Sequence, residues 1–246
     1  MNAKRPACAA PALETPAPAA SQTYSYSDLP REESASTALA EEVALAIAYN
    51  GISQAVMLVT PTDLEDFIVG FSLGSGIIED ASDIYDLQLT GAGSAQYAQV
   101  TIANRAFWNL KQQRRQLAGT SGCGLCGVAA LEQALPQLTA LPPSPLPPAA
   151  HLRELRARIA SVQSLARHSG ALHAALFVDQ DGEIGLCRED IGRHNALDKL
   201  IGALRQQGLS VREGFVVITS RCSLELIHKA VRGEFATLVS LSAPTN

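Results

Sequence analysis

The sequence has few charged and few aromatic residues. Charged residues make up 17% of the 246 residues, against about 25% in typical soluble domains. Acidic residues outnumber basic ones by 24 to 19, which gives a formal net charge of −5. A general nucleic-acid-binding protein is usually basic, so the net charge argues against this class. No uninterrupted apolar run approaches about 18 residues, and no membrane span is therefore predicted.

The N-terminus also lacks the apolar core of a signal peptide, because Pro6, Pro11, Glu14 and Pro16 interrupt it. The odd number and uneven spacing of the five cysteines do not fit a secreted disulfide framework. We therefore expect a soluble protein of the cytoplasm. In that reducing compartment, a Cys-x-x-Cys pair is typical of metal, redox or sulfur chemistry.

Two proline-rich segments predict the domain organisation. Residues 1–20 contain eight Ala and four Pro, a composition that cannot form a compact core and predicts a disordered tail over residues 1–37. The cluster Leu141-Pro-Pro-Ser-Pro-Leu-Pro-Pro148 predicts a stiff linker at 142–149. The remaining segments are a β-containing subdomain (38–118), a Gly/Cys loop with a short helix (119–141) and an α/β domain (150–246).

Hydrophobic periodicity predicts the elements of the first half. Alternating apolar residues over 43–49, then Asn50-Gly51, then an apolar run at 52–59 predict a β-hairpin with a type I′ turn. Thr62-x-x-Glu65 matches a capping box at the start of a helix. Further predicted elements are strands at 84–89 and 96–102 and a helix at 105–117.

The second half alternates helices and strands. An apolar stripe from Leu152 to Ala166 predicts one helix stopped by Gly170. Strands are predicted at 172–178, 183–187, 215–219 and 237–242, and helices at 195–204 and 223–232. This order indicates an α/β sheet with a right-handed crossover.

The loop Gly119-Thr-Ser-Gly-Cys-Gly-Leu-Cys-Gly127 is the strongest chemical signal. Glycines leave little bulk beside Cys123 and Cys126 and predict a flexible backbone. No Asp or Glu occurs from Leu87 to Leu131, whereas Arg105, Lys111, Arg114 and Arg115 lie there. Positive charge without nearby carboxylates favours a thiolate, so the pattern indicates a nucleophile.

Two other interpretations of the cysteine pair remain open. Cys187 and Cys222 could complete a structural Cys₄ zinc site, although their spacing is unusual for one. A thioredoxin-like redox pair is the second alternative, although here a helix, not a strand, precedes the loop.

Two polar segments lie where a predicted strand enters a predicted helix, the usual ligand position in α/β folds. The first is Arg188-Glu-Asp-Ile-Gly-Arg-His-Asn195, followed by Asp198 and Lys199, in which Arg193 and His194 suit phosphate. In the second, Ile218-Thr-Ser-Arg-Cys-Ser223, Arg221 could reach an anion. We interpret the density of the first cluster as a binding pocket. His173 shows no ligand spacing and is assigned to structure or solvent.

Several of these motifs together resemble the formate dehydrogenase accessory sulfurtransferase (FdhD) family. They are Ala46–Gly51, Pro61–Phe67, the Gly-Cys-Gly-Leu-Cys-Gly loop, Glu189–Lys199 and Leu241–Thr245. The resemblance spans residues 39–245. It implies an α/β (α+β) fold with a cytidine-deaminase-like C-terminal α/β domain and an N-terminal β-containing subdomain. The deaminase zinc motif itself is absent, so zinc deamination is not expected.

The resemblance implies a sulfur carrier that takes persulfide sulfur from a cysteine desulfurase. The sulfur is passed to a molybdenum cofactor, bis-molybdopterin guanine dinucleotide, which formate dehydrogenase requires. Cys123 is expected to carry the persulfide with Cys126 assisting, and Arg193, His194 and Arg221 are expected to hold the cofactor's phosphates. No tightly held metal is expected, and a homodimer is left open.

The sequence departs from the family pattern at two places. Ser75 stands where the family commonly has Glu. Family chains continue beyond the Ser-Ala-Pro-Thr motif, whereas this sequence ends at Asn246, so the C-terminal domain is expected to be truncated.

Overall fold

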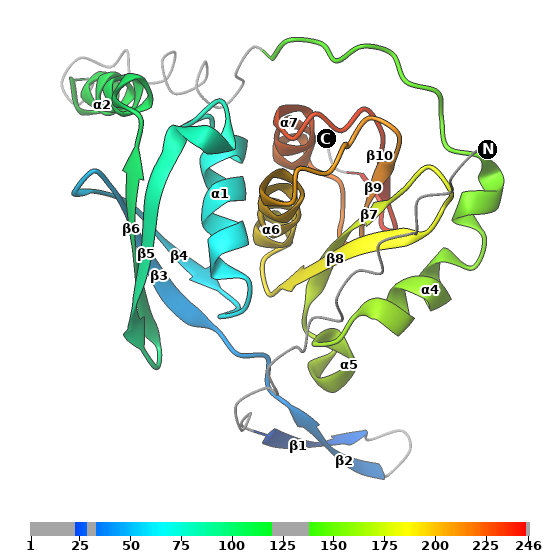
Figure 1. Ribbon diagram of the computed structural model, residues 1–246. Helices are drawn as coiled ribbons and strands as arrows, with labels where there is room; N and C mark the ends of the chain where they lie inside the picture. Colours follow the sequence, from blue (N-terminus) through cyan, green and yellow to red (C-terminus); the bar gives the residue numbers. More distant parts are fainter. Residues whose placement is uncertain (1–22, 29–32, 120–137, 245–246) are drawn as a thin grey trace, which may run out of the picture.

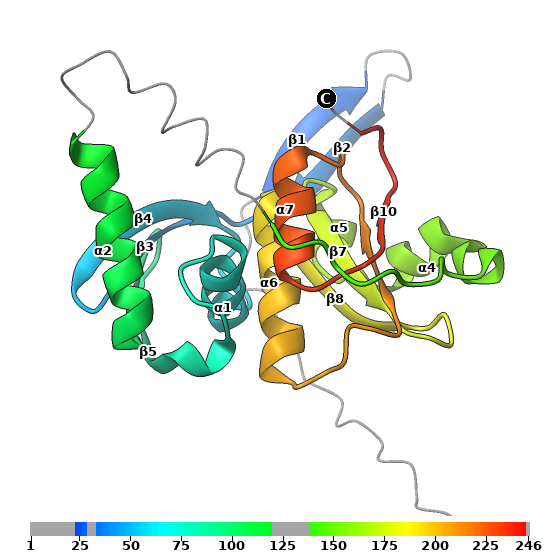
Figure 2. The same cartoon turned by 90° about the horizontal axis from the view of Figure 1, so that it is seen from above.

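The computed structural model describes residues 23–28, 33–119 and 138–244. Two four-stranded sheets face each other with helices α1 and α6 packed side by side between them (Figures 1 and 2). Each sheet is built from one half of the chain. This arrangement confirms the predicted mixed α/β fold.

The first sheet has the strand order β4-β3-β6-β5. Its strands are β3 (Val43–Tyr49), β4 (Ile52–Val59), β5 (Ile84–Ala92) and β6 (Ala95–Ile102). The predicted hairpin is confirmed, because β3 and β4 pair antiparallel around Asn50 (φ 46°) and Gly51 (φ 80°). Successive side chains of β3 point to opposite faces of the sheet, and the buried face carries Val43, Leu45, Ile47 and Tyr49.

Helix α1 (Leu64–Gly74) covers the inner face of this sheet through Phe67, Ile68 and Leu73. The predicted capping box is wrong: the N-cap is Asp63, which has φ 52° and makes no side-chain cap bond. The start of α1 is held from the other half of the chain, because Arg188 Nε lies 2.7 Å from Asp66 and 3.7 Å from Asp63.

The second sheet has the order β10-β9-β7-β8. Its strands are β7 (His173–Val178), β8 (Ile184–Asp190), β9 (Phe215–Ile218) and β10 (Leu238–Ser240). Helices α6 (Arg193–Gln206) and α7 (Leu224–Arg232) pack on one face and α4 (Leu155–Val162) on the other. Parallel pairing of β9 with β10, joined by α7, confirms the predicted strand–helix–strand unit.

The single helix predicted from Leu152 to Ala166 is wrong. The chain forms a 3₁₀ turn (Ala149–Leu152), then α4, then the short α5 (Ala166–Ser169), which ends at Gly170 with φ 65°. Between α4 and α5, the backbone N–H groups of residues 164–166 donate to the carboxylate of Glu189, each at 2.8 Å. The Glu189 carboxylate on β8 thus accepts the hydrogen bonds that main-chain carbonyl oxygens would accept in a continuous helix.

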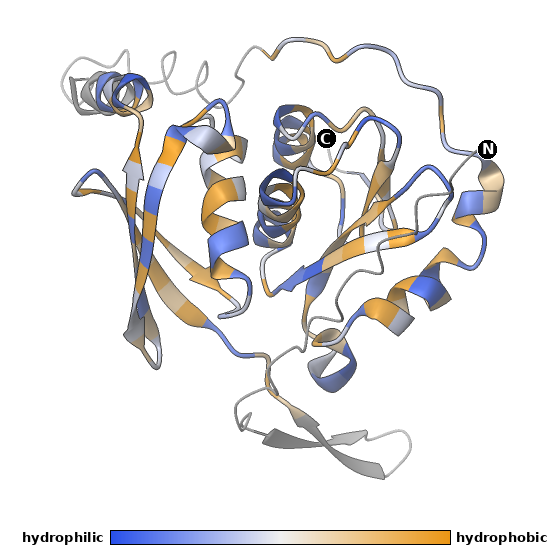
Figure 3. Ribbon diagram, viewed as in Figure 1, coloured by the Kyte–Doolittle hydropathy of each residue, from blue (hydrophilic) through white to orange (hydrophobic). Residues whose placement is uncertain are grey.

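Helices α1 and α6 meet backbone to backbone. A Cβ added to Gly70 would lie 1.7 Å from the Asp198 carbonyl oxygen, and one added to Gly202 would lie 1.9 Å from that of Asp66. A single cluster of buried apolar side chains then extends from the first sheet through both helices to the second sheet. Apolar residues are frequent on the strands of both sheets (Figure 3).

The predicted tail differs from the structure in its second part. Strands β1 (Thr23–Asp28) and β2 (Glu33–Ala38) form an antiparallel hairpin. The Tyr24-Ser-Tyr-Ser27 alternation favours extended backbone, and pairing provides partners for the backbone polar groups.

The remaining elements are a short 3₁₀ helix (Ala81–Asp83), α2 (Asn104–Gly119) and the proline-rich linker. Residues 138–148 contain neither helix nor strand and run over the outside of the second half, past α7, toward α4 (Figure 1). Among the described residues, no helix is both long and apolar enough to cross a membrane.

Candidate functional site

The predicted nucleophiles Cys123 and Cys126 lie outside the described residues. The structure does place the element that leads to them: α2 ends at Gly119, and three residues separate Gly119 from Cys123.

The second predicted site lies at the edge of the second sheet where β8 and β9 end. Both strands are antiparallel to β7 and therefore end at the same edge, next to His173 at the start of β7. Helix α6 begins three residues after β8, and α7 begins six residues after β9. Two helix N-termini thus lie at one sheet edge, an arrangement suited to an anion.

Arg193 and His194 occupy the first turn of α6, and Ser223 is the N-cap of α7. Among the described residues, Arg193 Nε and Ser223 Oγ are buried atoms without a hydrogen-bond partner. His194 Nε2 lies 3.1 Å from the Glu225 carboxylate, but the geometry does not satisfy hydrogen-bond criteria. Arg193 Nε and Ser223 Oγ thus have no hydrogen-bond partner among the described residues at this edge.

The electrostatics of this edge also favour an anion. Burial lowers the pKa of His194, and the charges of Arg193, Lys229 and His173 lower it further, whereas Glu225 opposes them. Burial lowers the pKa of His173 too, again with a contribution from Arg193. The neighbouring positive charges thus disfavour the protonated form of both histidines, and an arriving negative charge would favour it.

The third predicted ligand residue, Arg221, lies exposed between β9 and α7. It extends from the same sheet edge as Arg193 and His194. The sequence interpretation missed His173, yet the predicted turn at 179–182 could have placed it there, because the hairpin pairs His173 with Asp190.

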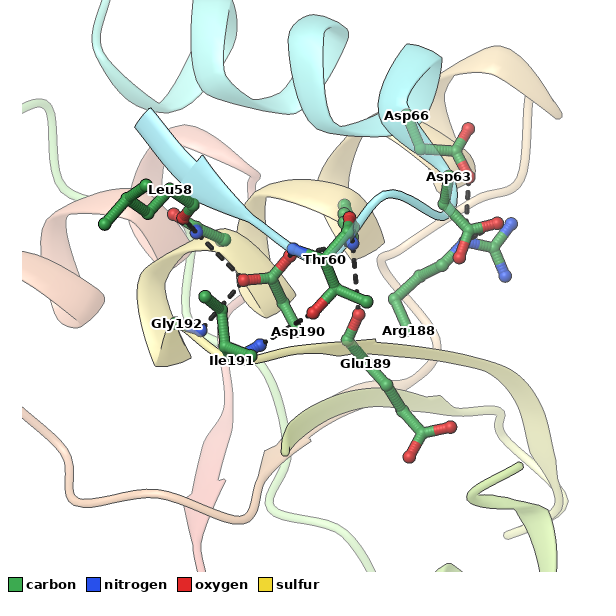
Figure 4. Close-up of polar contacts among 11 residues, drawn as sticks. Leu58, Thr60, Asp63, Asp66, Arg188, Glu189, Asp190, Ile191 and Gly192 are labelled. Carbon is green, nitrogen blue, oxygen red and sulfur yellow. Dashed lines mark hydrogen bonds and ion pairs between the residues drawn. The ribbon is translucent and has the colours of Figure 1, made fainter. Parts of the chain in front are cut away.

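Most of the polar segment around Asp190 is internal rather than ligand-facing. The Asp190 carboxylate accepts hydrogen bonds from the backbone N–H of Thr60 (3.0 Å) and Gly192 (2.8 Å) and from Asn195 Nδ2 (2.9 Å). It also lies 2.8 Å from Lys199 Nζ. Figure 4 shows how these contacts tie the end of β4 to the turn before α6.

Lys199 completes this connection between the halves. Its side chain is fully buried, and Nζ donates to the carbonyl oxygens of Thr60 (3.0 Å) and Glu189 (3.2 Å). A second buried pair joins Lys229 of α7 to both carboxylate oxygens of Asp198, each at 2.9 Å. The contacts of Asp190 and Lys199 with Thr60 join the two halves, whereas the Asp198–Lys229 pair joins α6 to α7 within the second half. A ligand role is thus left to Arg193 and His194.

The two described cysteines do not fit one metal site. Cys187 packs with the cluster on the α4 side of the second sheet, whereas Cys222 packs with the cluster on the α6 side. Burial raises the pKa of Cys187 to about 12 and also raises that of Cys222. Within the described ranges there is no group of three or more His, Cys, Asp or Glu side chains placed to hold a metal ion.

A hollow beside the linker lies elsewhere. It measures about 360 Å³ and lies between residues 144–148, the turn around Asp179, and the start of β9 at Phe215. This is the opposite edge of the sheet from Arg193 and His194.

Comparison with known proteins identifies the class. The chain from residue 40 to 246 matches the FdhD/NarQ family. The sulfur carrier protein FdhD of Cupriavidus necator is 46% identical over 212 residues, which cover 84% of this chain and 72% of that protein. The Burkholderia mallei protein of the same name is 43% identical over 227 residues, covering 87% and 81%. The chain therefore belongs to the FdhD/NarQ family.

A solved structure supports the fold independently. The crystal structure of a putative formate dehydrogenase accessory protein from Desulfotalea psychrophila aligns with a TM-score of 0.67. The alignment covers 92% of this chain and 84% of that one at 22% sequence identity. At this identity the likeness concerns the fold alone.

Proposed function

We propose that this chain is a sulfur carrier that acts in the maturation of formate dehydrogenase. The single observation that carries the proposal is the Gly-Cys-Gly-Leu-Cys-Gly loop, which follows a helix without acidic residues. Its membership of a family whose relatives are called sulfur carrier proteins supports the same role.

The sulfur donor in this proposal is a cysteine desulfurase in the cytoplasm. The Cys123 thiolate attacks the terminal sulfur of the donor's persulfide, forming a new S–S bond as the donor's S–S bond breaks. The donor cysteine leaves as a thiolate, so no external oxidant is needed. Basic residues before the loop favour the attacking thiolate, and Cys126 assists as the neighbouring thiol. The chain thus acts as a sulfurtransferase.

The acceptor in this proposal is the molybdenum of bis-molybdopterin guanine dinucleotide, bound as substrate. Its phosphates bind at the edge formed by Arg193, His194 and Arg221. The unpartnered Arg193 Nε, the positive charges that lower the pKa of His194, and the two helix N-termini support this assignment. The sulfur that moves is formally neutral, so the reduced metal supplies two electrons and Cys123 is left as a thiolate.

Mass spectrometry after incubation with a cysteine desulfurase and cysteine tests the carrier role. We expect a gain of one sulfur on the peptide containing Cys123, its loss in Cys123→Ser, and no effect of the control Cys8→Ser. An unmodified loop would contradict the proposal. Stoichiometric zinc that is lost in Cys123→Ser would instead support a zinc-stabilised escort module.

A guanine nucleotide tests the acceptor site. Arg193→Ala should weaken GDP binding about tenfold, as expected for one charge-assisted contact. Arg212→Ala is the matched control, because Arg212 is exposed at the opposite edge of the sheet. An equal loss of GDP affinity in both variants would contradict a phosphate site at Arg193.

A further inference from the structure

Helix α2 differs in charge from the rest of the chain. It contains Arg105, Lys111, Arg114 and Arg115 and no acidic residue, in a protein whose net charge is −5. Arg105 is balanced from outside the helix, since its guanidinium lies 2.6 Å from Glu79. The sequence of the helix therefore carries net positive charge in an acidic protein.

The same helix exposes its tryptophan. Ala106 and Leu110 are 4% and 3% exposed and attach α2 to the core, whereas Trp108 is 57% exposed. Trp is among the residues most enriched where binding energy concentrates in protein interfaces. Since burial against this chain does not account for Trp108, its large apolar surface is available to a partner.

Lys111 holds this surface in place. Its Nζ lies 4.2 Å from the ring centre of Phe107 and 5.5 Å from that of Trp108. These cation–π contacts restrict the aromatic rings before any partner arrives. Groups that are already ordered lose less conformational entropy on binding.

The position of α2 separates it from the proposed cofactor site. In Figure 1, α2 lies above the end of β6, whereas α6, whose first turn contains Arg193 and His194, lies on the other side of α1. Yet α2 directly precedes the segment that contains Cys123. A protein bound to α2 would thus stand beside the start of the cysteine loop and leave the Arg193 edge uncovered.

We propose that the face of α2 formed by Trp108 and Lys111 docks the protein sulfur donor, and that the donor surface around its persulfide is acidic. This inference rests on the proposed carrier function. The charge of α2 selects an acidic partner, because complementary potentials accelerate encounter and suppress other partners. Trp108 supplies the apolar contact that lengthens the lifetime of the complex.

Sulfur loading from two donors tests the docking surface. A desulfurase with cysteine requires docking, whereas glutathione persulfide reaches the loop directly. With a subsaturating desulfurase, Trp108→Ala and Lys111→Glu should each slow loading about tenfold, and added salt should slow the wild type. Loading from glutathione persulfide should stay within twofold of wild type for Trp108→Ala. For Lys111→Glu it should fall less than desulfurase loading does, because Lys111 also contributes to the positive charge that favours the Cys123 thiolate.

The matched control is Tyr97→Ala, which removes an exposed aromatic side chain from β6. Equal desulfurase loading of wild type, Trp108→Ala and Lys111→Glu would overturn the docking surface while leaving the carrier function intact. Parallel losses with both donors in Trp108→Ala would also overturn it, because they would place the defect in the loop. Failure of either donor to load the wild type would instead overturn the proposed function, and the docking surface with it.

Discussion

Asp198 shows how burial and pairing oppose each other at a single residue. Its carboxylate is 1% exposed and pairs with Lys229, yet burial raises its pKa to about 6. The free-energy cost of burying the charged carboxylate therefore exceeds the stabilisation that its ion pair with Lys229 provides. Stability should depend on pH through this residue.

The expected sign follows from proton uptake. Between the unfolded pKa of about 3.9 and the folded value of about 6, the folded protein holds a proton that the unfolded chain releases. The contribution of Asp198 to the unfolding free energy is thus present at pH 4 and lost as pH rises through 6. Relative to Asp198→Asn, the wild type should lose about 2 kcal/mol between pH 4 and 7.

Urea unfolding of both proteins at several pH values measures this difference. Asp86→Asn, at an exposed carboxylate on β5, serves as the control and should show little change. A wild-type-minus-variant difference that stays constant with pH would contradict the prediction.

His173 and His194 predict a second pH dependence. Both have lowered pKa values in the free protein, and a bound phosphate would raise them. Binding therefore takes up protons, and the affinity for GDP should rise as pH falls through these pKa values. Calorimetric titration between pH 5.5 and 7.5 measures the effect.

The double variant His173→Asn/His194→Asn isolates the contribution of the protein, because titration of the ligand is common to both proteins. We expect its affinity to vary less with pH than that of wild type. His168→Asn changes an exposed histidine and should behave as wild type. An unaltered pH profile in the double variant would place phosphate elsewhere.

The residue types in the segment 188–199 did not show which charged side chains pair inside the protein and which face a ligand. Asp190, Asn195, Asp198 and Lys199 were grouped with Arg193 and His194 because all lie within one short segment. Periodicity predicted the buried face of α6, but Lys199 and Asp198 lie fully within that packing. Their partners, Thr60 and Lys229, lie far away in sequence, so no local pattern identifies them.

At the scale of elements, the contact between α1 and α6 depends on two glycines. Gly70→Ala should separate the helices and destabilise the protein by several kcal/mol, because the added methyl group meets backbone rather than a side chain that can move. Thermal unfolding measures the loss. Gly185→Ala on β8 is the control, since the nearest atom to its added Cβ is 4.0 Å away. A similar melting temperature for both variants would contradict this packing.

The sequence predicted secondary-structure elements whose position depends on adjacent residues, but not those whose ends depend on contacts with residues distant in sequence. The hairpin at Asn50-Gly51 depends on two successive residues with positive φ, a local property. The break between α4 and α5 depends on Glu189, at least 23 positions away from the amides that it accepts. The apolar stripe in that segment does form the helix α4, but hydrogen bonds to the distant Glu189 carboxylate set where the helix ends.

At the scale of the whole molecule, the linker joins two halves that share one core. Because the apolar cluster, Asp190 and the α1–α6 contact all cross between the halves, the covalent connection contributes little to their association. Cleavage at a protease site inserted between Pro142 and Pro148 should leave both fragments together in gel filtration. Combined with Gly70→Ala, the same cleavage should let them separate. Separation of the otherwise unchanged cleaved protein would show that the linker holds the halves together.

The buried polar groups between the halves also have a calorimetric consequence. Unfolding exposes Asp190, Lys199, Asp198 and Lys229 to water together with the apolar side chains around them. Exposure of apolar surface raises the heat capacity, whereas exposure of polar surface lowers it. The heat-capacity increment of unfolding is therefore smaller than that of an equally large, wholly apolar contact. The free energy of unfolding consequently curves less with temperature, and the hydration penalty of these ions weakens on warming.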